Sequence, residues 1–246
     1  MRALPMWSLG LPARAVITLA RVLNVAANSL ALAPASRLPA AHPHPRCGSV
    51  RCSSSGDAGW RTITARSNPK IKLVAKLHVR RQRERSGKML LEGHRLVLDA
   101  LDAGLEPEFV LLHDAALEAA EGPRLREALR ASGVAVHRVP APLLAELTET
   151  QTPQGVLAVL PQAVAALPLP PSPSLVLVAD GVAEPGNLGT LLRSAAGCGV
   201  EAALLSAGCS DAWGGKALRA GMGAQWRLPL RANLTWPQIS EKLAGV

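Results

Sequence analysis

The stretch LVLVADGVAEPGNLGTLLRSAA, residues 175–196, decides the fold. Its first five residues, 175–179, are all apolar, which is typical of a strand that is buried on both faces of a parallel sheet. A turn containing Gly186 and Gly189 follows, and residues 188–196 have the composition of a helix. A strand that leads through a turn into a helix indicates an α/β fold, in which ligands bind at the carboxyl ends of the strands.

The rest of the C-terminal part continues this alternation of strands and helices. We expect strands at residues 202–205 and 226–230 and a short helix at residues 216–223. Thr235 and Gln238 have the spacing of a capping box and predict the start of a last helix. We therefore predict a parallel-sheet domain over residues 175–246.

A separate α/β domain is expected over residues 60–160. Asn68 can cap a first helix, and Pro69 suits the first turn of that helix. Apolar and helical segments then alternate: strands at 89–91, 109–112, 134–139 and 156–160, and helices at 95–103 and 124–131. The prolines of residues 161–174 disfavour both helices and central strands, so this segment is predicted to be a linker between two packed units.

Positive charge is concentrated in the N-terminal part of the chain, whose formal net charge is +9. Residues 60–90 hold ten Lys or Arg and one acid, whereas residues 91–246 hold eleven basic and sixteen acidic residues. This distribution favours a polyanion such as RNA as the partner, although a solvated helix face explains the same charges equally well. Tyr is absent and there is one Phe, which argues against modules that stack RNA bases on rows of aromatic side chains.

Residues 1–59 are predicted to be an organelle transit peptide or disordered leader. Residues 1–56 contain no acid and are rich in Ala, Arg, Leu and Ser. Val-Arg-Cys at residues 50–52, followed by three serines, is similar to a plastid processing site and favours the chloroplast. Arg14 and Arg21 on an amphipathic stretch also suit mitochondrial import, which is the alternative.

Membrane and metal sites are not expected. No apolar run reaches the ~18 residues of a membrane span. The spacing of the four cysteines fits no zinc pattern, and Cys47 and Cys52 with their two neighbouring histidines lie in a Pro-, Ser- and Gly-rich stretch.

The turn after residue 180 is the candidate site. The free N–H groups at the start of the helix suit a phosphate, and Arg193 can face back over that start. Neither a Walker loop nor a dinucleotide fingerprint is present. The residues alone thus indicate a sheet edge that binds an anion or a nucleotide. A purely structural turn is the open alternative.

Four stretches, in order, resemble the SpoU/TrmH family of RNA ribose 2′-O-methyltransferases. EPGNLG at residues 184–189, with Arg193, is similar to the family's first signature motif. The others are LEGHR at 91–95, TPQGV at 152–156, and DAW with KALRAGMGA within 211–224. Their order and spacing agree over residues 62–235.

The resemblance implies a substrate-binding domain followed by a SPOUT-type methyltransferase domain with a C-terminal trefoil knot. It implies methyl transfer from S-adenosylmethionine to a ribose 2′-hydroxyl, with ribosomal RNA as the favoured substrate and a homodimer through the knot. Arg193 would help to activate the hydroxyl and Asn187 would shape the site. Because arginine is a poor base, we favour a positioning and electrostatic role for Arg193.

RNA contacts are expected from both domains. In the catalytic domain they are Glu184, Gly186, Gly189, Lys216 and Arg219. In the first domain they are Lys70, Lys72, Lys76 and Arg95.

The C-terminal part departs from the family pattern. Nothing after Thr235 resembles the family's second and third motifs, a Gly-x-Glu segment and a Ser-Leu-Asn segment, so no residue is assigned to the methyl donor and weak or no donor binding is expected. An incomplete gene model, a splice form and a shortened protein all remain open. Two alternative functions are a catalytically incomplete RNA-binding protein derived from this family and a generic nucleotide-binding α/β protein.

Overall fold

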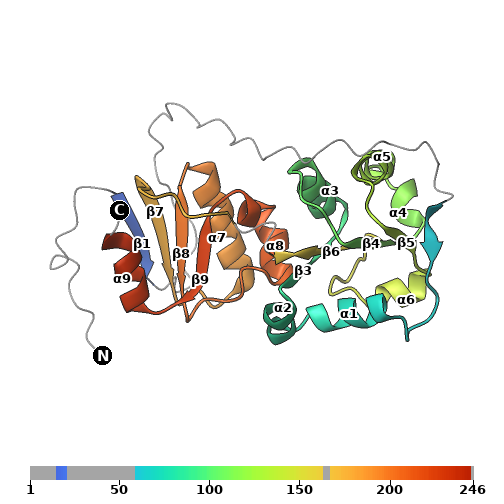
Figure 1. Ribbon diagram of the computed structural model, residues 1–246, viewed down its shortest axis with the longest axis horizontal. Helices are drawn as coiled ribbons and strands as arrows, with labels where there is room; N and C mark the ends of the chain where they lie inside the picture. The colour runs from blue at the N-terminus through green and yellow to red at the C-terminus, as the bar shows by residue number, and fades with distance from the viewer. Residues whose placement is uncertain (1–14, 21–58, 163–166, 245–246) are drawn as a thin grey trace.

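The computed structural model describes residues 15–20, 59–162 and 167–244. They form two lobes that lie side by side, each built on one β-sheet (Figure 1). The expected α/β fold is confirmed. Within the described ranges, no helix has the length and apolar character needed to cross a membrane.

The first lobe is a five-stranded sheet between two layers of helices. The strand order is β2-β5-β4-β6-β3; β5 runs parallel to β2 and β4, and β6 runs antiparallel to β3 and β4. The strands are β2 (Arg61–Thr62), β3 (Lys88–Glu92), β4 (Phe109–Leu112), β5 (Val136–Arg138) and β6 (Val156–Pro161).

Helices cover both faces of this sheet. In Figure 1, α3, α4 and α5 lie above the sheet and α1, α2 and α6 below it. They are α1 (Pro69–Leu77), α2 (Arg80–Ser86), α3 (His94–Asp102), α4 (Ala115–Glu118), α5 (Gly122–Ser132) and α6 (Ala141–Ala145). Because strand side chains alternate, Val110 and Leu112 of β4 pack toward α3 and α5, whereas Phe109 and Leu111 pack toward α1.

The second lobe is a parallel sheet of order β1-β7-β8-β9. Apolar side chains of α7 pack on one face of the sheet and Ile239 of α9 packs on the other. The elements are β7 (Leu175–Asp180), α7 (Pro185–Gly197), β8 (Ala202–Ser206), α8 (Gly215–Gly221), the 3-10 helix η4 (Ala224–Trp226), β9 (Leu230–Leu234) and α9 (Trp236–Ala244).

Strand β1 (Ala15–Ala20) is an edge strand from a distant part of the sequence. It pairs in parallel with β7, from Ala15 opposite Leu175 to Ala20 opposite Asp180. These residues fall within the predicted leader, for which no strand is expected from the sequence. The remainder of the predicted leader up to residue 58, including Cys47 and Cys52, lies outside the described residues.

Local capping follows the predictions. The Asn68 side chain accepts a hydrogen bond of 2.9 Å from the Lys70 N–H, and Pro69 is the first residue of α1. At the start of α9, the Gln238 side chain accepts a 2.9 Å hydrogen bond from the Thr235 N–H.

The predicted third strand at residues 226–230 is wrong. Trp226 ends the 3-10 helix η4, and the strand begins only at Leu230. The Trp226 side chain is 2% exposed and packs in the apolar cluster of the first lobe, so burial against the other lobe fixes the local backbone instead of strand pairing.

The two lobes share a core. Leu218 of α8 and Trp226 belong to the cluster that otherwise consists of first-lobe residues such as Met89 and Val97. Trp213 is half-buried and packs against the clusters of both lobes. The proline-rich segment therefore joins two units that pack on each other.

A buried histidine predicts how stability depends on pH. His137 of β5 is 8% exposed, and neither ring nitrogen has a hydrogen-bond partner among the described residues. Burial lowers the pKa of His137, and the charges of Lys70 and Arg61 lower that pKa further. The unfolded chain therefore binds a proton at this site more readily than the folded chain does.

We expect the stability that depends on neutral His137 to be present above the unfolded pKa of about 6.5 and to fall as the pH drops below it. His137→Leu removes this titration, so the melting temperature of the variant should fall less between about pH 7.5 and pH 5.5 than that of the wild type. Scanning calorimetry of both proteins measures the difference. Equal losses would show that His137 does not contribute.

Candidate functional site

The candidate site lies where β7 ends and α7 begins. Gly181 follows β7 with a φ of +65°, a left-handed conformation that favours glycine. Glu184 is the N-cap of α7, and its carboxylate accepts a 2.5 Å hydrogen bond from the Asn187 N–H. The turn therefore presents Glu184 and the first residues of α7 at the carboxyl edge of the parallel sheet.

Glu184 is held as a carboxylate. The Lys216 ammonium of α8 lies 2.5 Å from its Oε1 and, with the backbone N–H groups of Asn187 and Gly186, lowers the pKa of Glu184. Lys216 and Glu184, both predicted RNA contacts, thus form an ion pair with each other. Their role in RNA binding stays a prediction.

Arg193 of α7 is a charged residue whose side chain has no partner in the part of the chain that the structure describes. It lies about two turns into α7, is exposed, and forms no ion pair or hydrogen bond with the described residues. Thr190, one turn earlier on the same side, donates its hydroxyl to the Gly186 carbonyl at 2.9 Å. Asn187 is also exposed, so both predicted catalytic side chains are available to a ligand.

Two glycines of the turn serve packing and capping. A Cβ at Gly189 would lie 2.3 Å from the Ala217 carbonyl oxygen and 2.8 Å from the Ala220 Cβ. Gly189 is buried where α7 packs against α8, so packing accounts for this glycine, and its predicted contact with RNA stays a prediction. A Cβ at Gly186 would lie 2.9 Å from the Glu184 carboxylate, so this glycine makes room for the cap.

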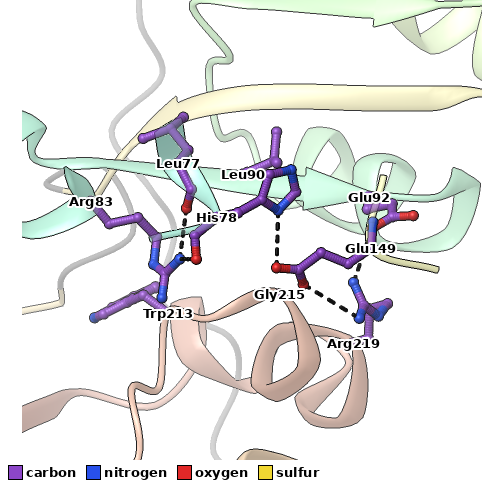
Figure 2. Close-up of a pocket in the computed structure, with 9 residues that line it drawn as sticks. All are labelled: Leu77, His78, Arg83, Leu90, Glu92, Glu149, Trp213, Gly215 and Arg219. Carbon is purple, nitrogen blue, oxygen red and sulfur yellow. Dashed lines mark hydrogen bonds and ion pairs between the residues drawn. The ribbon is translucent and has the colours of Figure 1, made fainter. Parts of the chain in front are cut away.

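Arg219, a further predicted RNA contact, lies at the contact between the lobes. Figure 2 shows its guanidinium directed at Glu92 and Glu149 of the first lobe. The nitrogen–oxygen distances are 3.1 Å to Glu92 and 3.9 Å to Glu149. Glu92 is 6% exposed and also accepts from the backbone N–H groups of Glu149 and Thr150, both at 3.4 Å. A buried carboxylate without such partners would be costly, so Arg219 has a structural task here.

Arg83 forms a second contact between the lobes that the sequence analysis did not predict. It is 6% exposed and donates to the carbonyls of Leu77 (2.6 Å) and His78 (2.8 Å) and to the Asp211 carboxylate (2.7 Å). Figure 2 shows it beside Trp213. In the sequence, Arg83 is one of many basic residues of a polar helix, so nothing distinguishes it from its solvated neighbours.

The basic residues of the first lobe that are predicted to contact RNA lie in two helical layers, on opposite faces of the sheet (Figure 1). Lys72 and Lys76 of α1 are exposed, whereas Lys70 is half-buried with its Nζ 4.8 Å from the centre of the Phe109 ring. Arg95 is exposed at the start of α3, in the opposite helical layer. Lys72, Lys76 and Arg95 form no ion pair with the described residues, so they are free to contact phosphate.

Comparison with known proteins places the chain in a family. The MRM3-like substrate binding domain family matches residues 68–158, and the SpoU rRNA Methylase family matches residues 174–246. A solved structure described as an RNA 2′-O ribose methyltransferase is 33% identical, with a TM-score of 0.60 over 72% of this chain and 67% of that chain. This chain belongs to the SpoU family of rRNA methylases.

Two further proteins, both named rRNA methyltransferases, are similar to this chain. The AdoMet-bound rRNA methyltransferase from Sinorhizobium meliloti is 26% identical, with a TM-score of 0.62 over 76% of this chain and 70% of that chain. Mitochondrial rRNA methyltransferase 3 of Homo sapiens is 39% identical over 168 residues, which is 65% of this chain and 39% of the relative. The chain thus spans about two fifths of the length of that relative.

The stretches that resemble SpoU proteins meet at two places. Glu184, from residues 184–189, pairs with Lys216 near the end of β7. Glu92, Gln154 and Arg219 meet near the end of β3, where Gln154 accepts a 2.9 Å hydrogen bond from the His94 N–H. Segments far apart in the sequence therefore come together at the end of β7 and at the contact between the lobes.

Proposed function

We propose that this chain forms the RNA-recognising part and first catalytic motif of an RNA ribose 2′-O-methyltransferase that uses S-adenosylmethionine and acts on organellar ribosomal RNA. The observation that carries the proposal is that Asn187, in the first turn of α7 at the carboxyl edge of the sheet, and Arg193, further along the same helix, are both exposed, with Arg193 unpaired among the described residues. The names of the relatives support the substrate class and the methyl donor, since one is an RNA 2′-O ribose methyltransferase and another is bound to AdoMet.

The reaction requires activation of a weak nucleophile. The methyl donor supplies an electrophilic methyl group on a sulfonium. The ribose 2′-oxygen forms the new O–C bond as the C–S bond breaks, and the hydroxyl proton leaves to water. Arg193 remains protonated throughout and stabilises the negative charge that develops on the 2′-oxygen. The proposed role of the exposed Asn187 is to hold the ribose by its side-chain amide.

The turn at the start of α7 would supply only one wall of a pocket for the methyl donor. The space beside Gly186 is filled by the Glu184 carboxylate, and the space beside Gly189 is filled by α8. These two glycines therefore pack against other parts of the protein. Further walls are needed to bury a ligand of this size.

Methyl transfer tests the activity. The chain is joined to the C-terminal segment of a relative that carries the Gly-x-Glu and Ser-Leu-Asn motifs, and tritiated S-adenosylmethionine is supplied with organellar ribosomal RNA. We expect label in dinucleotides that resist alkaline hydrolysis, because a methylated 2′-oxygen cannot attack the adjacent phosphate. RNA binding without any transfer would favour the binding module over the enzyme.

RNA binding by the first lobe should depend on salt. Each phosphate contact contributes about −0.7 to the log–log salt slope on single-stranded RNA. Lys72→Glu with Lys76→Glu should therefore flatten the slope by more than ~1, measured by fluorescence anisotropy. The control is Lys242→Glu on α9, which also reverses exposed charge. A slope altered equally by both variants would mean that α1 is a solvated face.

Targeting to an organelle is proposed from the acid-free leader and from the mitochondrial relatives. Residues 1–59 fused to a fluorescent protein should enter mitochondria or, as residues 50–52 favour, chloroplasts. Diffuse cytosolic fluorescence would contradict this proposal.

A further inference from the structure

A groove of about 630 Å³ opens on the first lobe, away from the α7 turn. It lies between α4 and α6, where β4 ends and β6 begins. Its lining includes His94, His113 and Gln154, which give it polar groups at fixed places. A volume of this size is ordinary for a small-molecule site and exceeds what a few water molecules fill.

The hydrogen-bonding state of each polar group follows from its partner. His94 is 4% exposed, and its Nε2 lies 2.6 Å from the Ala116 carbonyl, which can only accept; Nε2 therefore carries the proton and Nδ1 is an acceptor. The Nδ1 of His113 accepts from the Ala115 N–H at 3.2 Å, so the neutral ring carries its proton on Nε2.

Gln154 completes this set. Its Oε1 accepts the His94 N–H, which leaves both hydrogens of the amide nitrogen to donate. The groove therefore combines one ring acceptor, on His94, with three N–H donors, one on His113 and two on Gln154, and hydrogen bonds to the backbone orient these side chains. Such a fixed arrangement suits the edge of a planar heterocycle, which presents donors and acceptors side by side.

The remaining walls are small and apolar. Ala119, Ala120 and Ala145 line the groove with single methyl groups, which leaves space for a flat ring without requiring an aromatic partner. Glu121 also lines it, and a carboxylate there disfavours a phosphate inside the groove. The neutral base of a nucleotide fits these walls better than its backbone does.

We propose that this groove holds one unpaired nucleobase of the bound RNA, read through His94, His113 and Gln154; this rests on the proposed function of RNA methylation. One end of the groove lies near the contact between the lobes, because Glu92, which contacts Arg219 of α8, ends β3 and His94 begins α3 only two residues later. The walls formed by α4 and α6 lie on the side of the first lobe away from the catalytic lobe (Figure 1).

The test separates bases from phosphates. A short single-stranded RNA and an abasic strand of the same length and charge are titrated into the full chain. Ala145→Trp fills the groove from an exposed position on α6, and Ala131→Trp is the matched control on an exposed position of α5. We expect Ala145→Trp to weaken binding of the base-containing strand about tenfold, with abasic binding unchanged and the control like wild type.

A second variant addresses recognition directly. Gln154→Glu keeps the acceptor for the His94 N–H, removes the two donors and adds a negative charge that both strands meet, so it should weaken the base-containing strand more than the abasic strand. If Ala145→Trp and Ala131→Trp bind both strands like wild type, or if wild type binds both strands equally, the groove has another occupant, such as a peptide, and the proposal is overturned while RNA binding stands. Binding of neither strand would overturn the proposed function and this inference with it.

Discussion

Arg193→Ala should lower the kcat of methyl transfer by about 100–1000-fold in the chain joined to the C-terminal segment of a relative. The guanidinium is exposed and unpaired among the described residues, so no structural contact is lost when it is removed. Its proposed partner is the negative charge that develops on the 2′-oxygen in the transition state. Removal of an interaction made only in the transition state lowers kcat and leaves ground-state binding nearly unchanged.

The measurement combines single-turnover kinetics with calorimetry of donor and RNA binding. Both dissociation constants should change by less than about tenfold. Arg193→Lys keeps the positive charge but loses the planar guanidinium, so intermediate activity is expected. Full turnover by Arg193→Ala would remove Arg193 from the mechanism, and an equal loss of RNA affinity would make it a binding residue instead.

Gly189→Ala should destabilise the chain by about 2–3 kcal/mol. Glycine to alanine inside a helix is ordinarily stabilising by up to ~1 kcal/mol, because alanine restricts the unfolded backbone. Here the new methyl group would lie 2.3 Å from a backbone oxygen of α8, which cannot move without separating the two helices. The steric cost therefore exceeds the gain in helix propensity.

Gly197→Ala is the matched control at the end of the same helix. A Cβ there meets nothing within 4 Å, so the substitution should stabilise the chain by a few tenths to about 1 kcal/mol. Urea denaturation monitored by circular dichroism compares both variants with wild type. The same sign of change for Gly189→Ala and Gly197→Ala would show that α7 and α8 do not pack as described.

Much of the fold could be predicted from local pattern. Residues 109–112 and the strand beginning at residue 175 are apolar runs with clear limits, and Asn68-Pro69 marks a helix start by its own chemistry. The third strand of the second lobe could not be placed. Its limits depend on burial of Trp226 against the other lobe, and no local pattern contains that information.

The same contrast between local and long-range information explains why only part of the candidate site could be predicted. Arg193 and Asn187 are exposed on α7, as a motif-based prediction requires. Gly189 is part of the sequence motif, but glycine is needed there because of a carbonyl on α8, 28 residues away in the sequence. Arg83 and Asp211 pair across 128 residues, and a polar helix rich in arginine gives no sign of which side chain will be buried.

The shared core of the two lobes bears on how this protein can be divided for study. Trp226 and Leu218 complete the apolar cluster of the first lobe, and Arg83, Arg219 and Arg227 pair with acids across the contact. Either lobe made alone would expose its half of that cluster to water. Severing the backbone between the lobes should leave two fragments that remain associated, so the limits of a folding unit here do not coincide with the limits of a sequence domain.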